Sequence, residues 1–289
     1  MKKMLSVAVI AMMALSLAAC SNSAPTSTAT ASVLNPTPVA TGNANVATGQ
    51  SHVDAIKKAG KLTVVTSADY PPYEFIDTAT GKPAGVDMDI AQAIADKLGV
   101  TLEVKNIQDF DGVLASLQAG YQDLAISGFT PTDERALVVD FSDPYSTTKN
   151  VVIVKKGNEN KYKSVAELAK AVVGAQRGSE QEDIANDFIK AKTVKTQTRI
   201  DTLLLSLSNS QIDAAVVEEP VAKAYLANMS GLAIANLDLG YEETGYCVVL
   251  NKNNKELQTI VNDTIKELKA SGKIDTFYKN AATKMTNQK

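Results

Sequence analysis

Residues 116–135 read SLQAGYQDLAISGFTPTDER, and residues 206–217 read SLSNSQIDAAVV. Without gaps, the first twelve residues of the earlier stretch match the later stretch at a constant offset of 90. The identical pairs are Ser116/Ser206, Leu117/Leu207, Asp123/Asp213 and Ala125/Ala215. Each stretch has the pattern of a helix end, a turn and a buried strand. Four identities in twelve also fit two unrelated helix–turn–strand units, but a true repeat predicts two similar lobes, each built on its own parallel sheet.

The rest of the chain from His52 onward alternates short β-type runs with helix-type segments, which indicates an α/β protein. The expected strands are LTVVTS, TLEVKNI, DLAIS, NVVIVKK, AVVGAQ, DAAVVE, LAIAN and GYCVVLN. Residues 86–99 (VDMDIAQAIADKLG) space their apolar side chains as a helix does, with Asp87 as the expected N-cap and Gly99 as the stop. Ser164 and Glu167 form a capping-box pattern, and two helices broken near residues 271–272 close the chain.

In open α/β sheets, ligands bind beyond the carboxyl ends of the strands. The residues that leave those ends are Gly128-Phe129-Thr130 in one unit and Glu218-Glu219-Pro220 in the other. At the offset of 90, Gly128 and Glu218 are counterparts. A loop suited to anions would therefore face an acidic loop, which is the arrangement that a zwitterion needs.

The first residues have the pattern of a secretory signal. Lys2 and Lys3 precede an apolar run that is too short for a confident membrane span, and the run ends at Leu17-Ala18-Ala19-Cys20. We expect a signal peptide over residues 1–19 and a lipid on Cys20; an ordinary signal peptide with an incidental cysteine is the alternative. Residues 20–51 are uncharged and almost free of large apolar side chains, which predicts a disordered tether.

Composition excludes several classes of function. A net charge of −3 offers no basic surface for nucleic acid. The chain has one histidine, His52, and lacks G-x-S-x-G, P-loop and G-x-G-x-x-G motifs and any Cys/His cluster, so we expect no catalytic residues, no metal and no cofactor. After removal of the signal peptide Cys20 is lipidated, so Cys247 has no partner for a disulfide and is expected in the core.

From about His52 to Ala282 the chain resembles the bacterial extracellular solute-binding proteins of the polar amino-acid type (family 3), which deliver substrates to ABC importers. The stretches that carry the resemblance are KLTVVTSADYPPYEF, GKPAGVDMDIAQAIADKLG, DGVLASLQAGYQDLAISGFTPTDERA, VDFSDPY, VGAQRGSEQEDIA and IDAAVVEEPVA. The resemblance implies a two-lobed periplasmic-binding-protein-like fold, in which each lobe is a mainly parallel sheet flanked by helices. Two hinge strands, within TTKNVVIV and LGYEETGY, would join a first lobe of residues 52–147 plus 242–289 to a second lobe of residues 148–241.

The resemblance also implies where the α-carboxylate of an amino acid would bind. Arg135 would pair with it bidentately, and the Thr130 hydroxyl and nearby N–H groups would complete the contacts. Ser179, at the start of a helix, would contribute its N–H and hydroxyl. Without the resemblance, Thr130 or Thr132 reads as a helix N-cap and Arg135 as a surface residue.

For the α-ammonium, the resemblance implies Glu218 and the carbonyl of Gly128. Glu218 departs from the family, which usually has an aspartate at this position, and Glu219 could exchange roles with it. The side chain of the ligand would meet Tyr70, which the family stacks over it. The other residues expected in the side-chain pocket are Phe129, Ser67, Glu180 and Gln181.

We therefore expect an extracytoplasmic lipoprotein that traps an amino acid between closing lobes and passes it to the permease subunits of an ABC importer. It would be a monomer attached to the membrane only by its lipid, on the outer face of a Gram-positive cell. Glu180, Glu218 and Glu219 favour a polar or cationic ligand, whereas Arg177 would favour an acidic one if it points inward. The alternatives are a dehydratase for prephenate-like or arogenate-like substrates (a cyclohexadienyl/arogenate dehydratase) and a ligand sensor for a separate receptor.

Overall fold

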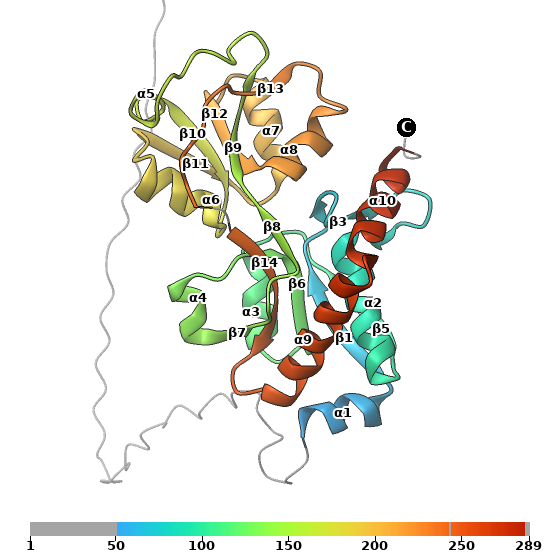
Figure 1. Cartoon of the computed structure of the whole chain (residues 1–289). Coiled ribbons are helices and arrows are strands. Elements are labelled where there is room, and N and C mark those ends of the chain that lie inside the picture. Colours follow the sequence, from blue (N-terminus) through green and yellow to red (C-terminus); the bar gives the residue numbers. More distant parts are fainter. Residues whose placement is uncertain (1–50, 243, 287–289) are drawn as a thin grey trace, which may run out of the picture. The chain divides into compact units, whose positions relative to one another are not determined.

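The computed structural model describes residues 51–242 and 244–286. The predicted signal peptide, Cys20 and the tether up to residue 50 lie outside these residues. The described chain forms two α/β lobes (Figure 1): lobe 1 is built around the sheet that contains β1, and lobe 2 around the sheet that contains β10. The prediction of a two-lobed α/β fold is confirmed.

The sheet of lobe 1 has the strand order β5-β1-β6-β14-β7, and β8 also pairs with β14. Its strands are β1 (Lys61–Thr66), β5 (Thr101–Asn106), β6 (Leu124–Phe129), β7 (Val139–Phe141), β8 (Ser146–Thr148) and β14 (Thr244–Asn251). β5, β1 and β6 are parallel, whereas β14 runs antiparallel to β6, β7 and β8. Successive residues Val64 and Val65 of β1 are fully buried in different apolar clusters, because helices cover both faces of the sheet.

The helices of lobe 1 are α1 (His52–Ala59), α2 (Val86–Leu98), α3 (Gly112–Gln118), α4 (Asp133–Val138), α9 (Lys255–Ala270) and α10 (Lys273–Thr286). On one face of the sheet α2 packs against α9 and α10, and on the other face α3 contacts β1, β6 and β14. α2 ends at Gly99 in the left-handed conformation, as predicted. The prediction that Asp87 caps this helix is wrong: Gly85 is the N-cap, with φ +129°, and Asp87 lies buried in the first turn.

The sheet of lobe 2 has the order β11-β10-β12-β9-β13. Its strands are β9 (Asn150–Lys155), β10 (Val172–Gln176), β11 (Thr193–Gln197), β12 (Ala214–Glu218) and β13 (Leu232–Ile234). β11, β10 and β12 are parallel, and β9 is antiparallel to β12 and β13. The helical segments are α5 (Val165–Leu168), α6 (Glu180–Asp183), the π-helix η1 (Ile184–Phe188), α7 (Ile200–Ser208) and α8 (Glu219–Leu226).

The internal repeat has a structural basis. In lobe 1 the strand after the repeat, β6, pairs with β1 so that Leu124 lies opposite Val64. In lobe 2 its counterpart, β12, pairs with β10 so that Ala214 lies opposite Val173. Leu124 and Ala214 are related by the offset of 90, so the two stretches occupy the same place in their sheets.

Between the lobes, the chain passes from β8 into β9 at residues 148–150 and returns between β13 and β14. The expected hinge segments, residues 147–154 and 239–246, overlap these two passages, and the lobe boundaries stay a prediction. A small sheet, β2 (Asp69–Tyr70), β3 (Glu74–Asp77) and β4 (Lys82–Ala84), was not expected from the sequence. In the part of the chain that the structure describes, no helix is both long and apolar enough to cross a membrane.

Candidate ligand-binding site

A buried cavity lies where the carboxyl ends of strands from both lobes meet. It has a volume of about 10 Å³, which is about the space that a single water molecule needs. Its lining residues are Tyr70, Phe110, Ser127, Gly128, Thr130, Arg135, Gln176, Ser179, Glu180, Gln181 and Glu218. Admission of an amino acid therefore requires the lobes to move apart.

Arg135 is the only basic residue that lines this cavity. Its guanidinium donates hydrogen bonds to the carbonyl oxygen of Thr130 and, across the lobes, to that of Gly178, both at 2.7 Å. It lies 5.2 Å from the ring centroid of Phe129. Burial lowers the pKa of Arg135 while nearby carboxylates oppose the shift, and a guanidinium stays charged in proteins. Arg135 is thus a buried cation with N–H groups left for a ligand.

The short helix α4 fixes the position of Arg135. Thr132 is its N-cap, and the Thr132 hydroxyl oxygen accepts a hydrogen bond from the Arg135 N–H at 3.2 Å. This stretch can therefore both cap α4 and contribute residues to the ligand-binding site. Thr132 takes the cap, Arg135 is buried, and Thr130 lines the cavity.

Gly128 forms the floor of the cavity next to Tyr70. Its φ of +57° is in the left-handed region, which favours glycine. Its N–H donates to the Asp87 carboxylate at 3.0 Å. A Cβ at this position would lie 3.4 Å from the Tyr70 ring, which is ordinary van der Waals contact, so the left-handed φ rather than crowding favours glycine here. The buried residue Asp87, which the sequence analysis assigned to helix capping, instead holds the backbone of the site.

Glu218 ends β12 and is 2% exposed. One carboxylate oxygen accepts a hydrogen bond from the Gln181 side chain at 2.7 Å. The other oxygen is buried and has no hydrogen-bond partner among the described residues. Burial raises the pKa of Glu218 to about 7, opposed by the neighbouring Tyr246 hydroxyl. Such an oxygen is free to accept a hydrogen bond from a cationic ligand.

The neighbouring residue Glu219 lies outside the cavity. Its carboxylate forms ion pairs with Lys223 at 2.9 Å and Lys149 at 3.6 Å. Arg177 also lies outside, half-exposed and 3.9 Å from Asp111. Of Glu218, Glu219 and Arg177, only Glu218 therefore lines the cavity.

Residues 179–181 bring a second carboxylate into the cavity. Ser179 is the N-cap of α6, and its hydroxyl donates to the carbonyl oxygen of Gln176 at 2.7 Å. Glu180 is 5% exposed and Gln181 4%. The lining thus contains one guanidinium and two carboxylates, Glu180 and Glu218, so with both carboxylates ionised its formal charge is −1.

Two expected residues do not line the cavity. Phe129 lies behind it, stacked on Phe110 at 4.7 Å between centroids. Ser67 is fully buried and donates to the Asp69 carboxylate at 3.3 Å. Phe110, Ser127 and Gln176 line the cavity but were missed. The position of Gln176 at the end of β10 was a usable signal, whereas nothing in the sequence marks Phe110.

Among the described residues no group of histidine, cysteine, aspartate or glutamate side chains could hold a metal ion. Two α/β lobes with a charged cavity at their facing strand ends define the class of two-lobed solute-binding proteins. The chain belongs to the bacterial extracellular solute-binding proteins, family 3, whose model matches residues 62–283. Members of this family are substrate-binding proteins that work outside the cytoplasm.

Individual relatives cover most of the chain. The arginine-binding extracellular protein ArtP of Bacillus subtilis (strain 168) is 32% identical over 81% of this chain and 90% of its own length. The amino acid ABC transporter substrate-binding protein AbpA of Streptococcus pneumoniae, solved bound to L-arginine, is 43% identical with a TM-score of 0.77, over 80% of this chain and 98% of that chain. The ancestral amino acid-binding protein AncCDT-1, a precursor of cyclohexadienyl dehydratase, is 34% identical with a TM-score of 0.73, over 80% and 99%.

Proposed function

We propose that this protein captures a cationic amino acid, arginine in particular, outside the cytoplasm and delivers it to the permease of an ABC importer. The observation that carries the proposal is the charge of the cavity. One guanidinium and two carboxylates line it, and an amino acid with a cationic side chain carries the complementary set of one carboxylate and two cations. One relative is named an arginine-binding protein and another was solved with L-arginine bound, which agrees with this choice.

In this proposal each charge of the ligand has one partner. The α-carboxylate pairs with Arg135 and accepts from N–H groups near Thr130, and the α-ammonium lies between Glu218 and the carbonyl oxygen of Gly128. The cationic end of the side chain reaches Glu180, with the Tyr70 ring stacked along the aliphatic part. Because Arg135 belongs to lobe 1 and Glu218 to lobe 2, one ligand satisfies both only when the lobes are closed.

We propose binding rather than catalysis. A dehydratase on the same fold is the second candidate, because Glu218 has the buried, neutral-range carboxyl expected of a general acid and because AncCDT-1 is a precursor of such an enzyme. Against it, a buried carboxyl group that accepts a hydrogen bond from Gln181 is also what an ammonium site requires. Incubation with prephenate and arogenate tests this candidate: turnover would support it, and no product would leave binding alone.

The lobe boundaries remain part of the proposal: residues 52–147 plus 242–289, and residues 148–241. They are supported by the sheets, since lobe 1 takes its strands from residues 61–148 and 244–251 and lobe 2 from residues 150–234. We also propose lipidation of Cys20, a flexible tether and a monomeric protein on the outer face of a Gram-positive membrane. Mass spectrometry of the N-terminal peptide tests the lipid, and light scattering tests the monomer.

Calorimetric titration of the ligand-stripped protein against the twenty amino acids and cystine tests the proposal. We expect tight binding of arginine, weaker binding of lysine and still weaker binding of acidic amino acids. Binding of neutral or acidic amino acids alone would overturn the cationic assignment while leaving the receptor role. Absence of binding by all of them would overturn both.

A further inference from the structure

Asp69 in lobe 1 makes a hydrogen bond to the first residue of a helix in lobe 2. Its side chain is 4% exposed, and one carboxylate oxygen accepts a hydrogen bond from the Ile200 N–H at 2.8 Å. Ile200 begins α7, whose own N-cap residue, Arg199, makes no side-chain capping bond. An N-cap acceptor normally comes from the residue just before the helix. Here a residue 131 positions away supplies it from the other lobe.

Two further elements of lobe 2 contact the same residue. The Tyr225 hydroxyl of α8 donates to the carbonyl oxygen of Asp69 at 2.7 Å. The Gln176 amide at the end of β10 lies 3.5 Å from the carboxylate. One residue of β2 is therefore bound by α7, α8 and β10, and it is adjacent in sequence to Tyr70 of the ligand cavity.

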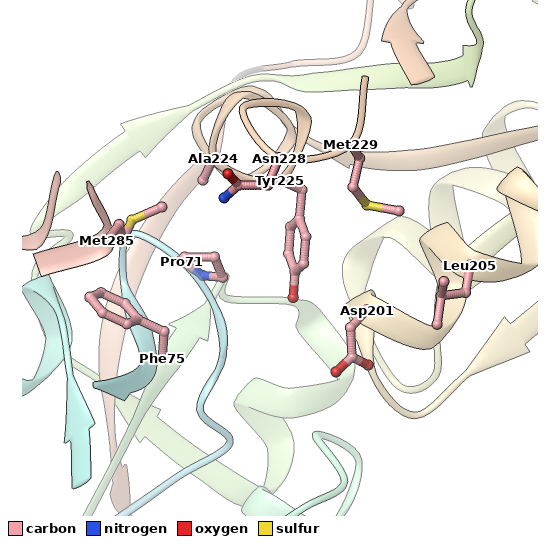
Figure 2. Close-up of a pocket in the computed structure, with 9 residues that line it drawn as sticks. All are labelled: Pro71, Phe75, Asp201, Leu205, Ala224, Tyr225, Asn228, Met229 and Met285. Carbon is pink, nitrogen blue, oxygen red and sulfur yellow. The ribbon is translucent and has the colours of Figure 1, made fainter. Parts of the chain in front are cut away.

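Apolar side chains of both lobes also pack together here: Tyr70 and Phe75 of lobe 1 belong to the same buried cluster as Ile200 and Leu203 of lobe 2. A cavity of about 500 Å³ lies beside the contact, with Pro71, Phe75 and Met285 from lobe 1 and Leu205, Tyr225 and Met229 from lobe 2 among its walls. Figure 2 shows the Tyr225 ring extending from α8 between Pro71 and Asp201. The hydrogen bonds of Asp69 therefore add directional links between the lobes beside an apolar contact.

The charged side chains that affect the pKa of Asp69, those of Arg199 and Asp201, lie at the start of α7. Burial raises the pKa of Asp69 to about 6, while the Ile200 N–H and the Arg199 guanidinium lower it and Asp201 raises it. Arg199 is paired with Asp201 at 2.9 Å, which leaves little net charge on this segment. Within lobe 1, the Ser67 hydroxyl also donates to the carboxylate.

We propose that Asp69 and Tyr225 form an interlobe latch that stabilises the closed lobes, in addition to the Arg135–Gly178 contact. When the lobes separate, the Ile200 N–H and the Tyr225 hydroxyl lose their partners in lobe 1. The latch sets how readily the protein closes and therefore contributes to ligand affinity without contacting the ligand. Asp69 and Tyr225 are positioning residues in this scheme.

The variants are Asp69→Ala and Tyr225→Phe, with Asp213→Ala as the control. Asp213 also accepts a backbone N–H, that of Val172 at 3.0 Å, but within lobe 2. Loss of a net hydrogen bond of about 1.4 kcal/mol corresponds to about a tenfold change. We expect Asp69→Ala to weaken arginine binding about tenfold and to increase the radius of gyration of the ligand-free protein in small-angle scattering. Asp213→Ala should lower the melting temperature and leave both quantities unchanged.

Tyr225→Phe keeps the ring and removes only the hydroxyl, so it tests the latch even if Asp69→Ala does not fold. It should weaken binding several-fold, and the double variant should lose less than the product of the two single effects because both act on one interface. The Ile200 amide should exchange faster with solvent in Asp69→Ala than in the wild type. Wild-type affinity, radius of gyration and exchange in the latch variants would overturn the latch.

The affinity part of this test rests on the proposed function, but the other parts do not. If the wild-type protein does not bind arginine, the proposed ligand is wrong, and the latch is judged on scattering and exchange of the ligand-free protein. If the wild type binds arginine and the variants do not differ from it in any readout, the latch alone is wrong.

Discussion

Asp123 in lobe 1 and Asp213 in lobe 2 make the same pair of contacts at equivalent positions. The Asp123 carboxylate accepts the Thr63 N–H at 2.8 Å, and its own N–H donates to the Thr63 carbonyl oxygen at 2.9 Å. The Asp213 carboxylate accepts the Val172 N–H at 3.0 Å, and its N–H donates to the Val172 carbonyl oxygen at 2.8 Å. The aspartates of the repeat therefore fasten each central strand to the start of its neighbour.

The two aspartates should nevertheless contribute unequally to the free energy of unfolding, because their burial and their further contacts differ. Asp123 is more buried than Asp213 and also accepts from the Thr63 hydroxyl and His52. We expect Asp123→Ala to cost about 2 kcal/mol of unfolding free energy and Asp213→Ala about 1 kcal/mol. Chemical denaturation measures both. Equal losses, or a change in ligand affinity in either variant, would contradict this role.

Replacement of Arg135 should abolish most of the binding. Arg135→Ala removes the only cation of the cavity lining, and removal of one partner of a buried charge pair costs roughly 2–5 kcal/mol, or about 30-fold or more in affinity. Arg135→Lys should recover only part of this, since lysine cannot bind a carboxylate bidentately. Calorimetry with arginine measures the effect.

The matched control for Arg135 is Arg177→Ala. Arg177 is half-exposed beside Asp111 and does not line the cavity. Its removal should leave affinity within a factor of about two, because exposed ion pairs contribute little. A loss comparable to that of Arg135→Ala would show that the carboxylate site has been assigned to the wrong arginine.

Ligand affinity should fall as the pH is lowered through 7. Burial raises the pKa of Glu218 to about 7, and an ammonium group binds the ionised carboxylate. Below this pH, binding requires loss of a proton, so affinity should fall by up to about tenfold per pH unit. Titrations at pH 8, 7 and 6 measure the slope, and Glu218→Gln should bind weakly with no slope over this range.

Stability of the ligand-free protein should change with pH in the opposite direction. The raised pKa values of Glu218 and Asp69 mean that the folded state binds protons more tightly than the unfolded chain. Their contribution is present at low pH and is lost as the pH rises through about 6 to 7. We expect a higher melting temperature at pH 5.5 than at pH 8. If affinity and melting temperature both rose with pH, ionisation of Glu218 and Asp69 would not be the cause.

Glu180 should determine the preference for a cationic side chain. In Glu180→Gln, arginine affinity should fall about tenfold, the usual scale for one charge-assisted hydrogen bond. Glutamine, which has no side-chain charge, should change less, so the ratio of the two affinities reports specificity. Glu219→Gln is the control, since its carboxylate pairs with lysines outside the cavity. If the ratio of arginine affinity to glutamine affinity is unchanged in Glu180→Gln, the cationic end of the ligand does not bind Glu180.

Gly85 should tolerate no side chain. It has φ +129°, and a Cβ there would lie 2.2 Å from the carbonyl oxygen of Tyr73. Gly85→Ala must displace backbone beneath the site, and we expect a loss of about 3 kcal/mol or more. Gly81 also has a positive φ, +67°, but nothing within 4 Å of a Cβ, so Gly81→Ala should cost only about 1 kcal/mol. Equal effects on melting temperature would contradict the close contact.

Much of the fold could be predicted because the local patterns agree with one another. The eight expected runs all contain strands, and the helix after Gly85 buries the apolar residues that its spacing indicated. β2, β3, β4, β7 and β11 were missed because they are short or polar. Asp87 was misplaced at a helix cap because its partners, Gly128 and Tyr145, are 41 and 58 residues away.

The sequence by itself determined that the chain is α/β, where its strands end and which charged residues leave those ends, because periodicity and strand ends are local properties. The two lobes were implied by the resemblance to the family, since the repeat alone also fits two unrelated units. Only the tertiary structure decided that Glu218 rather than Glu219 lies at the cavity, that Arg177 and Phe129 do not, and that Asp69 caps a helix of the other lobe. These depend on which side chains meet when two separately formed lobes close on each other. The free energy of those meetings comes from burial and hydrogen bonds between residues more than 100 positions apart, which no local pattern records.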